Sequence, residues 1–434
     1  MPARARSSSP SPGSTTAETH SWQGVSVTDP RVFAIVGASL TGARAAEELR
    51  SAGFAGRIVL IGAEHELPYE RPPLSKGYLL GTDPRDKAYV HPADWYADHD
   101  VELLLGVRAT NLDTATHTVT LDGRDPVRYD KLLLATGSRV RRLDVPGADL
   151  PGVRYLRTLP DADALATELP AARHVVVVGA GWIGLETAAA ARSHGAEVTV
   201  VELDRAPLRR VLGDEVAAVF TALHEAHGVD FRFGAGVREF HAAAGRLASV
   251  ILTDGTELDA EVAIVGVGIT PAVELAGSAG LAVDNGITVD ASLRTGDPDV
   301  YAAGDVANVA HPVLGKGIRV EHWSNARNGG TAAARSMLGD PVSYDRIPYF
   351  FTDQYDLGME YAGWVEPGGY DRVVFRGDPK AGEFIAFWLK DNRVLAGMNV
   401  NVWDVQEQIQ ALVRAGYAGQ PVDPAKLADP GVPL

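Results

Sequence analysis

The 434-residue chain contains no cysteine. This absence excludes a disulfide framework, a thiolate nucleophile, a cysteine-ligated zinc ion and a cysteine-ligated iron–sulfur cluster. Any redox chemistry of the chain must therefore use a bound organic cofactor. The histidines are scattered without metal-ligand spacing, so we expect no metal site.

Positive charge and long apolar runs are also scarce. The chain has 40 Lys and Arg against 56 Asp and Glu, a formal net charge of −16, whereas a nucleic-acid-binding protein needs a basic surface. No apolar run approaches the roughly 20 residues that are needed to cross a bilayer. We therefore expect neither nucleic acid nor membrane as a partner, and a cytoplasmic location.

The first 30 residues are rich in Ser, Pro, Thr and Ala with scattered Arg. They lack the apolar segment of a secretory signal, and we expect a disordered tail over residues 1–30. A targeting leader is the alternative, but the apolar periodicity of an amphipathic helix is missing. At about 150 residues per domain, the length predicts two to four domains.

A long module occurs twice in the chain. Each copy consists of a short apolar strand, a glycine-rich turn, a helix and a second strand followed by a glutamate, and then a predicted β-hairpin. The first copy runs from Val32 to Glu64 and the second from His174 to Glu202. Because chance seldom repeats several features in order, we infer a duplicated dinucleotide-binding unit.

The glycines of each turn have separate physical roles. The first permits a tight turn, the second lets a pyrophosphate approach the backbone, and the third lets the helix pack close to the strand. The second copy carries the full pattern with its downstream acid: Gly179, Gly181, Gly184 and Glu202. The first copy has Ser39 between Gly37 and Gly42, so the phosphate must lie farther away or accept a hydrogen bond from the hydroxyl group.

Two dinucleotide sites in one chain suggest two dinucleotides that exchange electrons, and FAD with a nicotinamide nucleotide is the natural pair. The predicted fold is α/β, with two Rossmann-like domains arranged as in glutathione reductase and a C-terminal α+β domain. In that third domain we expect a strand over residues 355–364 among others, and a helix over 405–415. The expected domains are an FAD-binding domain (31–145 and 263–346), an NAD-binding domain (146–262) and the C-terminal domain (347–434).

Four segments carry a family resemblance. They are Leu67-Pro-Tyr-Glu-Arg-Pro-Pro-Leu-Ser-Lys76, Ala135-Thr-Gly-Ser138, Ala303-Gly-Asp305 and Glu321-His-Trp-Ser-Asn325. With them, residues 31–434 resemble the FAD-dependent, NAD(P)H-linked ferredoxin and rubredoxin reductases that serve ring-hydroxylating dioxygenases and haem monooxygenases. Putidaredoxin reductase and apoptosis-inducing factor share that fold.

The resemblance implies a set of site residues. Those expected at FAD are Gly37, Ser39, Gly42, Glu64, Arg71, Lys76, Ala109, Ala135, Thr136, Gly137, Arg139, Gly304, Asp305 and Trp323. Those expected at NAD are Gly179, Gly181, Ile183, Gly184, Glu186, Glu202 and Gly268, with Glu321 near the nicotinamide. A catalytic ion pair between Lys76 and Glu186 is expected beside the flavin.

The resemblance further implies that NADH reduces FAD, and that the flavin passes electrons to a ferredoxin that feeds an oxygenase. Glutathione-reductase-like thiol enzymes are excluded by the missing cysteine. Two alternatives stay open: a reductase of a small acceptor such as a quinone or monodehydroascorbate, and a redox-sensing FAD protein like apoptosis-inducing factor.

Charge patterning bears on both expected partners. A carboxylate at Glu202 favours NADH over NADPH, although Arg205, Arg209 and Arg210 lie just downstream. Because a ferredoxin is usually acidic, a basic patch is needed for its docking. The candidates for that patch are Arg139, Arg141, Arg142, Arg154 and Arg157.

Overall fold

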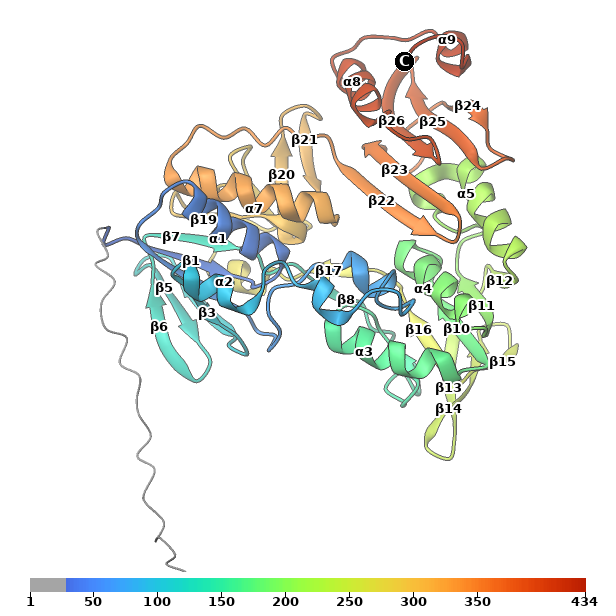
Figure 1. Ribbon diagram of the computed structural model, residues 1–434, viewed down its shortest axis with the longest axis horizontal. Coiled ribbons are helices and arrows are strands. Elements are labelled where there is room, and N and C mark those ends of the chain that lie inside the picture. Colours follow the sequence, from blue (N-terminus) through green and yellow to red (C-terminus); the bar gives the residue numbers. More distant parts are fainter. Residues whose placement is uncertain (1–28) are drawn as a thin grey trace, which may run out of the picture.

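The computed structural model describes residues 29–434, so the tail expected over 1–30 lies outside the described residues but for its last two positions. Two parallel sheets and one antiparallel sheet dominate these residues. Figure 1 shows the third sheet, at the C-terminal end of the chain, above α4 (Trp182–Ser193) and beside α5 (Arg209–Ala226). The α/β class with a separate C-terminal domain is confirmed.

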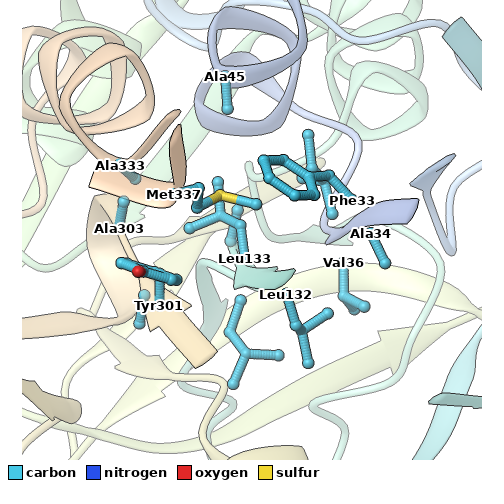
Figure 2. Close-up of a cluster of buried hydrophobic side chains, with 14 of the residues drawn as sticks. Phe33, Ala34, Val36, Ala45, Leu132, Leu133, Tyr301, Ala303, Ala333 and Met337 are labelled. Atoms are coloured by element: carbon cyan, nitrogen blue, oxygen red, sulfur yellow. The ribbon is translucent and has the colours of Figure 1, made fainter. Parts of the chain in front are cut away.

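The first parallel sheet has the strand order β19-β7-β1-β2-β3. Its strands are β1 (Val32–Val36), β2 (Arg57–Ile61), β3 (Val101–Leu104), β7 (Lys131–Leu134) and β19 (Val300–Ala302). Helices α1 (Leu40–Ser51) and α7 (Trp323–Leu338) pack on each other beside this sheet. Figure 2 shows the resulting core, in which Phe33 and Leu133 of the sheet lie against Ala45 and Met337 of the two helices. Strands that are buried on both faces need continuous apolar runs, which is what the sequence supplies.

The second parallel sheet has the order β12-β11-β10-β16-β9. Its strands are β9 (Val153–Arg154), β10 (His174–Val178), β11 (Glu197–Glu202), β12 (Val229–Phe233) and β16 (Val262–Val265). The helices of this unit are α3 (Leu159–Glu168), α4 and α5. In both units the glycine-rich turn connects the middle strand to the helix that follows it.

Smaller elements complete the two units. Each has a three-stranded antiparallel sheet: β4 (Ala109–Asp113), β5 (Thr118–Leu121) and β6 (Arg124–Arg128) in one, and β13 (Val237–Ala243), β14 (Arg246–Leu252) and β15 (Glu257–Asp259) in the other. The remaining strands are β8 (Ser138–Val140), β17 (Ile269–Pro271), β18 (Ile287–Val289), β20 (Ala307–His311) and β21 (Lys316–Arg319). The short helices are α2 (Ala93–Asp98) and α6 (Glu274–Ser278), and the 3-10 turns are η1 (Pro72–Ser75), η2 (Arg85–Ala88), η3 (Leu169–Ala171) and η4 (Gly304–Val306).

We propose the domain limits that the sequence suggested. Strand β19 pairs with β7 although almost 170 residues separate them, so the first unit is built from two stretches of chain. The antiparallel pair of β8 with β17 lies where the chain passes between the two units. Both observations support an FAD-binding domain formed by 31–145 and 263–346, with 146–262 inserted between them.

The C-terminal domain is an antiparallel sheet of order β22-β23-β26-β25-β24. Its elements are β22 (Tyr349–Gln354), β23 (Leu357–Gly363), β24 (Arg372–Asp378), β25 (Glu383–Lys390), β26 (Arg393–Val400), α8 (Gln406–Tyr417) and α9 (Pro424–Ala428). The single strand expected over 355–364 is wrong at its start. Tyr355 has a φ of +56° and lies in the turn of a hairpin, so residues 349–354 form a separate strand. That strand was missed because polar side chains at Thr352 and Gln354 occupy its buried face.

The C-terminal domain packs on the second unit and forms a hydrogen bond with it. Strand β22 and η1 both pack on α4. The fully buried Trp388 donates a hydrogen bond from Nε1 to the carbonyl oxygen of Leu212 in α5, at 2.9 Å. All three domains therefore meet around the N-terminal half of α4.

Candidate functional site

One large cleft, of about 980 Å³, runs between the three domains. Its volume lies at the upper end of the roughly 300–1,000 Å³ that is typical of small-molecule sites. Fourteen of the predicted site residues line it: Ser39, Arg71, Lys76, Ala135, Gly137, Gly179, Gly181, Ile183, Glu186, Glu202, Gly268, Asp305, Glu321 and Trp323. The structure therefore brings together, in one cavity, residues from both glycine-rich turns.

The first glycine-rich turn requires glycine at two positions. Gly37 has a φ of +123°, and a Cβ there would lie 2.0 Å from the carbonyl oxygen of Ala135. A Cβ on Gly42 would lie 2.1 Å from the carbonyl oxygen of Gly37. Between them, Ser39 stands at the N-terminal cap of α1, and its hydroxyl oxygen accepts a hydrogen bond from Arg71 at 2.6 Å. A cation beside a helix N-terminus that has free N–H groups suits a phosphate.

The second turn repeats the same geometry with one open position. A Cβ on Gly179 would lie 2.5 Å from the carbonyl oxygen of Gly266, and one on Gly184 would lie 1.9 Å from that of Gly179. At Gly181, which is the N-terminal cap of α4, an added Cβ would meet no atom within 4 Å. The backbone is thus exposed to the cleft where a pyrophosphate is expected. These cradles fit one dinucleotide at each turn.

Glu202 closes the second turn at the end of β11. Its carboxylate accepts hydrogen bonds from the backbone N–H of Ala180 at 2.7 Å and of Asp204 at 2.8 Å. Downstream, Asp204 forms ion pairs with Arg209 at 3.3 Å and with Arg210 at 3.7 Å. Arg205 pairs with Asp214 at 2.6 Å, so all three arginines that were expected to soften a preference for NADH are held by neighbouring carboxylates.

We expect Asp204→Asn to shift the enzyme toward NADPH. The amide oxygen can still accept the backbone hydrogen bond from Arg205, whereas Arg210 loses its counter-ion and becomes free to meet a 2′-phosphate. Arg209 keeps a second carboxylate partner, Asp214, at 2.6 Å. The ratio of kcat/KM for NADPH to that for NADH should rise about tenfold, which corresponds to about 1.4 kcal/mol. Asp230→Asn, which breaks a surface pair with Arg232, is the control and should leave the ratio unchanged. An unchanged ratio in Asp204→Asn would contradict this assignment.

The predicted catalytic pair is present and buried. Lys76 Nζ lies 2.7 Å from Glu186 Oε1, and the side chain of Glu186 is 4% exposed. Ser75 donates a hydrogen bond to the other carboxylate oxygen at 2.5 Å, and Thr352 donates one to Oε1 at 2.5 Å. The ammonium group also lies 5.5 Å from the ring centre of Phe351. Three domains thus contribute to a single charged cluster in the cleft wall.

A second ion pair in the cleft joins the two nucleotide-binding units. Arg157 donates from Nη2 to Asp305 Oδ2 at 2.9 Å, and burial together with the nearby Arg71 lowers the pKa of Arg157. Its side chain is 17% exposed, so the expectation that Arg157 belongs to a surface patch for a partner is wrong. Sequence spacing gave no signal for this pair, because 148 residues separate its members.

Other candidates for that basic patch are paired on the surface. Arg139 forms a bidentate pair with Glu274 at 2.7 and 3.0 Å, and Arg154 pairs with Glu168. Arg139 does not line the cleft, so its expected contact with FAD stays a prediction.

The remaining predicted residues lie around the cleft and not in its lining. Gly37, Gly42 and Gly184 make close backbone packing possible, and Gly304 leaves room for the side chain of Thr41. The hydroxyl group of Thr136 donates to the carbonyl oxygen of Ala272 at 2.7 Å. Glu64 accepts a hydrogen bond from the hydroxyl group of Tyr69 at 2.5 Å. Ala109 is the first residue of β4. The cofactor contacts predicted for these positions stay predictions.

The wall near α7 contains two perturbed titratable groups. Burial raises the pKa of Glu321, against the opposing effect of its ion pair with Arg319. Burial lowers the pKa of His322 to about 4, and the ring stacks on Phe350 with centroids 4.4 Å apart. Near neutral pH this part of the cleft therefore carries an uncharged imidazole.

Stability should fall as the pH drops below about 6.5. Burial lowers the pKa values of both His224 and His322 from 6.5 to about 4. Between these values the unfolded chain binds more protons than the folded one, so each ring costs about 2 kcal/mol of unfolding free energy at pH 5 relative to pH 8. Urea unfolding midpoints at the two pH values measure the loss. Replacing His224 with Gln should make the pH dependence shallower; an unchanged slope would contradict the expectation.

Two further findings concern absences in residues 29–434. Within that range, no helix is both long and apolar enough to span a bilayer. The same residues contain no cluster of three or more His, Asp or Glu side chains arranged to hold a metal ion.

Comparison with known proteins identifies the family of this chain. The family model described as pyridine nucleotide-disulphide oxidoreductase matches residues 32–330, and the model described as reductase C-terminal matches residues 349–434. The ferredoxin–NAD(+) reductase component of the anthranilate 1,2-dioxygenase system of Burkholderia cepacia is 42% identical over 403 residues, which cover 93% of this chain and 98% of that protein.

Two solved structures are similarly close. A ferredoxin reductase from Rhodopseudomonas palustris superposes with a TM-score of 0.88 at 37% identity, covering 93% of this chain and 98% of that one. Putidaredoxin reductase, in its covalent complex with putidaredoxin, superposes with a TM-score of 0.88 at 35% identity, covering 93% and 97%. These matches confirm the resemblance inferred from the sequence: the chain belongs to the pyridine nucleotide-disulphide oxidoreductase family and, within it, to the ferredoxin reductases.

Proposed function

We propose that this protein is a flavoprotein reductase that passes electrons from NADH through FAD to a small iron–sulfur protein, which in turn feeds an oxygenase. One observation carries the proposal. Two glycine cradles open into a single cleft, with the buried pair of Lys76 and Glu186 between them, in a chain that has no cysteine. The geometry suits two dinucleotides, and the composition excludes a thiol relay or a cysteine-ligated cluster of the protein's own.

The residues of this chain bind the two cofactors and orient them relative to each other. The turn at residues 37–42 with Arg71 holds the phosphates of FAD, and the turn at residues 179–184 with Glu202 holds NADH. When bound, FAD accepts a hydride from NADH and releases electrons one at a time. Lys76 supplies a positive charge that favours the negative charge of the reduced ring, and Glu186 fixes that ammonium group. Arg157 and Asp305 hold the cleft wall on the other side.

The named relatives support the choice of acceptor. The relative from Burkholderia cepacia is the reductase component of a dioxygenase system, and the putidaredoxin reductase structure contains its iron–sulfur partner. This chain covers 98% of the first of these proteins and 97% of the second. A cytoplasmic location is part of the proposal and stays a prediction.

Reduction of cytochrome c with and without ferredoxin tests the proposal. The purified protein should be yellow, should oxidise NADH, and should reduce cytochrome c at least tenfold faster when a panel of ferredoxins is added. Equal rates without ferredoxin would favour the reductase of a small acceptor instead, and a long-lived complex of flavin and NAD that turns over slowly would favour a redox sensor. A colourless protein that takes up no FAD would refute all three.

A further inference from the structure

A continuous chain of buried hydrogen bonds reaches the Lys76–Glu186 pair from helix α5. Gln354 Nε2 donates to Thr352 Oγ1 at 3.2 Å, and Thr352 donates onward to Glu186 Oε1 at 2.5 Å. At the far end, Nε2 of His224 lies 2.8 Å from Gln354 Oε1. We call His224, Gln354 and Thr352 the hydrogen-bond chain. It begins in the second unit, passes through the C-terminal domain, and ends at the ion pair with the first unit.

The direction of every hydrogen bond in the chain follows from the carboxylate. A carboxylate that is paired with Lys76 can only accept, so the single hydroxyl proton of Thr352 must point at Glu186. Thr352 then accepts from the amide N–H of Gln354, which leaves the amide oxygen facing His224. The Nε2 atom of His224 must therefore carry a proton. All the donors point toward Glu186, an arrangement in which each bond polarises and strengthens the next.

The burial of these three polar side chains indicates that the hydrogen-bond chain has a role beyond packing. Thr352 and Gln354 are each 1% exposed, and His224 is fully buried. Apolar side chains would cover this interface without the desolvation cost of three polar groups. Within the described part of the chain, Nδ1 of His224 has no hydrogen-bond partner, so the ring makes its hydrogen bond through Nε2. Burial also lowers the pKa of His224 to about 4, which keeps the ring neutral with one N–H to donate.

We propose that His224, Gln354 and Thr352 are positioning residues that fix the Glu186 carboxylate and, through it, the Lys76 ammonium group in the cleft. The inference rests on the proposed function, in which Lys76 faces the flavin. Without Thr352, the Oε1 atom of Glu186 would be held by Lys76 alone, and the carboxylate would gain freedom to rotate about the bond that Ser75 makes to Oε2. The C-terminal domain would thus act on the reaction without touching a cofactor.

The test uses the full-length, FAD-loaded protein with Thr352→Val, which removes the hydroxyl group at almost constant volume. Two readouts are taken without ferredoxin: the rate of flavin reduction by NADH in stopped flow, and the midpoint potential of the flavin. We expect the rate to fall about threefold to tenfold, the scale of one lost hydrogen bond, and the potential to become more negative as Lys76 loses its fixed position. Thr352→Ser restores the hydroxyl group and should restore both values.

Thr187→Val is the matched control. Thr187 is fully buried in the same helix as Glu186, and its hydroxyl group donates only to the carbonyl oxygens of Ile183 and Gly184. The same substitution there tests the effect of losing a buried hydroxyl group in α4 without breaking the hydrogen-bond chain. If Thr352→Val matches Thr187→Val in both rate and potential, the inference is overturned.

A second variant tests whether the whole hydrogen-bond chain acts on Glu186, or only the contact with Thr352. His224→Phe should change the midpoint potential of the flavin in the same direction as Thr352→Val, but by less. The variant that carries both substitutions should resemble Thr352→Val alone, because the loss of the Thr352 hydroxyl group already breaks the hydrogen-bond chain. Effects of His224→Phe and Thr352→Val that add fully would overturn the coupling. A wild-type protein that binds no FAD overturns the proposed function, whereas an active wild type with an unaffected Thr352→Val overturns this inference only.

Discussion

Lys76→Met is expected to slow the reduction of the bound flavin by NADH about tenfold to a hundredfold. Methionine keeps an unbranched apolar side chain that is one heavy atom shorter than lysine, but it removes the charge that favours reduced flavin. It also leaves the Glu186 carboxylate, whose side chain is 4% exposed, without its counter-ion. Removing one partner of a buried pair costs about 3–5 kcal/mol, so the thermal midpoint should fall as well. Stopped-flow absorbance and thermal unfolding measure the two effects.

Two further variants serve as a control and a comparison for Lys76→Met. Lys87→Met removes a lysine whose side chain is 62% exposed and pairs with Asp83, and it should leave rate and stability unchanged. Glu186→Gln keeps the size of the side chain, but its single amide oxygen can accept the hydrogen bond of only one of Ser75 and Thr352, and it has no charge to hold Lys76. Its rate should lie between those of wild type and Lys76→Met. A wild-type rate in Lys76→Met would remove the ion pair from the mechanism.

Gly181→Ala is expected to weaken NADH binding at least tenfold without destabilising the protein. A methyl group at this position meets no protein atom within 4 Å, and the residue has a φ of −80°, which any residue adopts. The methyl group would instead occupy the space where the pyrophosphate approaches the backbone. Titration of the FAD-loaded protein with NADH measures the dissociation constant, and the thermal midpoint should match that of wild type.

Gly184→Ala should fail in a different way. Its Cβ would lie 1.9 Å from the carbonyl oxygen of Gly179, so α4 would have to move away from β10. A loss of about 1–3 kcal/mol of stability should accompany the loss of NADH binding. Gly277→Ala, where a Cβ meets nothing within 4 Å and which lies outside the cleft lining, controls for alanine substitution in general. If Gly181→Ala binds NADH normally, the pyrophosphate does not lie at this turn.

Local patterns explain why so much of the two dinucleotide units could be predicted. The strand that begins at Val32 and the one that begins at His174 are buried on both faces, so their apolar runs stand out. In each turn the last glycine is required by a contact of about 2 Å with a residue close in sequence: Gly42 with Gly37, and Gly184 with Gly179. The hairpin at Tyr355 was missed because the buried face of β22 is partly polar, which hides the alternation that marks a strand.

The residues around the ion pair could not be read in the same way. Thr352 is 166 residues from Glu186, and nothing near either position indicates the other. Arg157 carries the same charge as its exposed neighbours, yet the fold turns it inward to Asp305. A single buried polar side chain costs free energy unless it meets a partner, and only the packing of three domains supplies those partners.

The amino-acid sequence by itself determined the duplicated nucleotide-binding unit and the exclusion of thiol chemistry, because short-range contacts and composition decide both. The tertiary structure alone decided that Thr352 joins Lys76 at Glu186, and that Arg157 is turned inward to Asp305. These contacts join residues that are more than 100 positions apart in the sequence. Hydrophobic burial brings the segments together, and no local sequence pattern indicates which residues will meet.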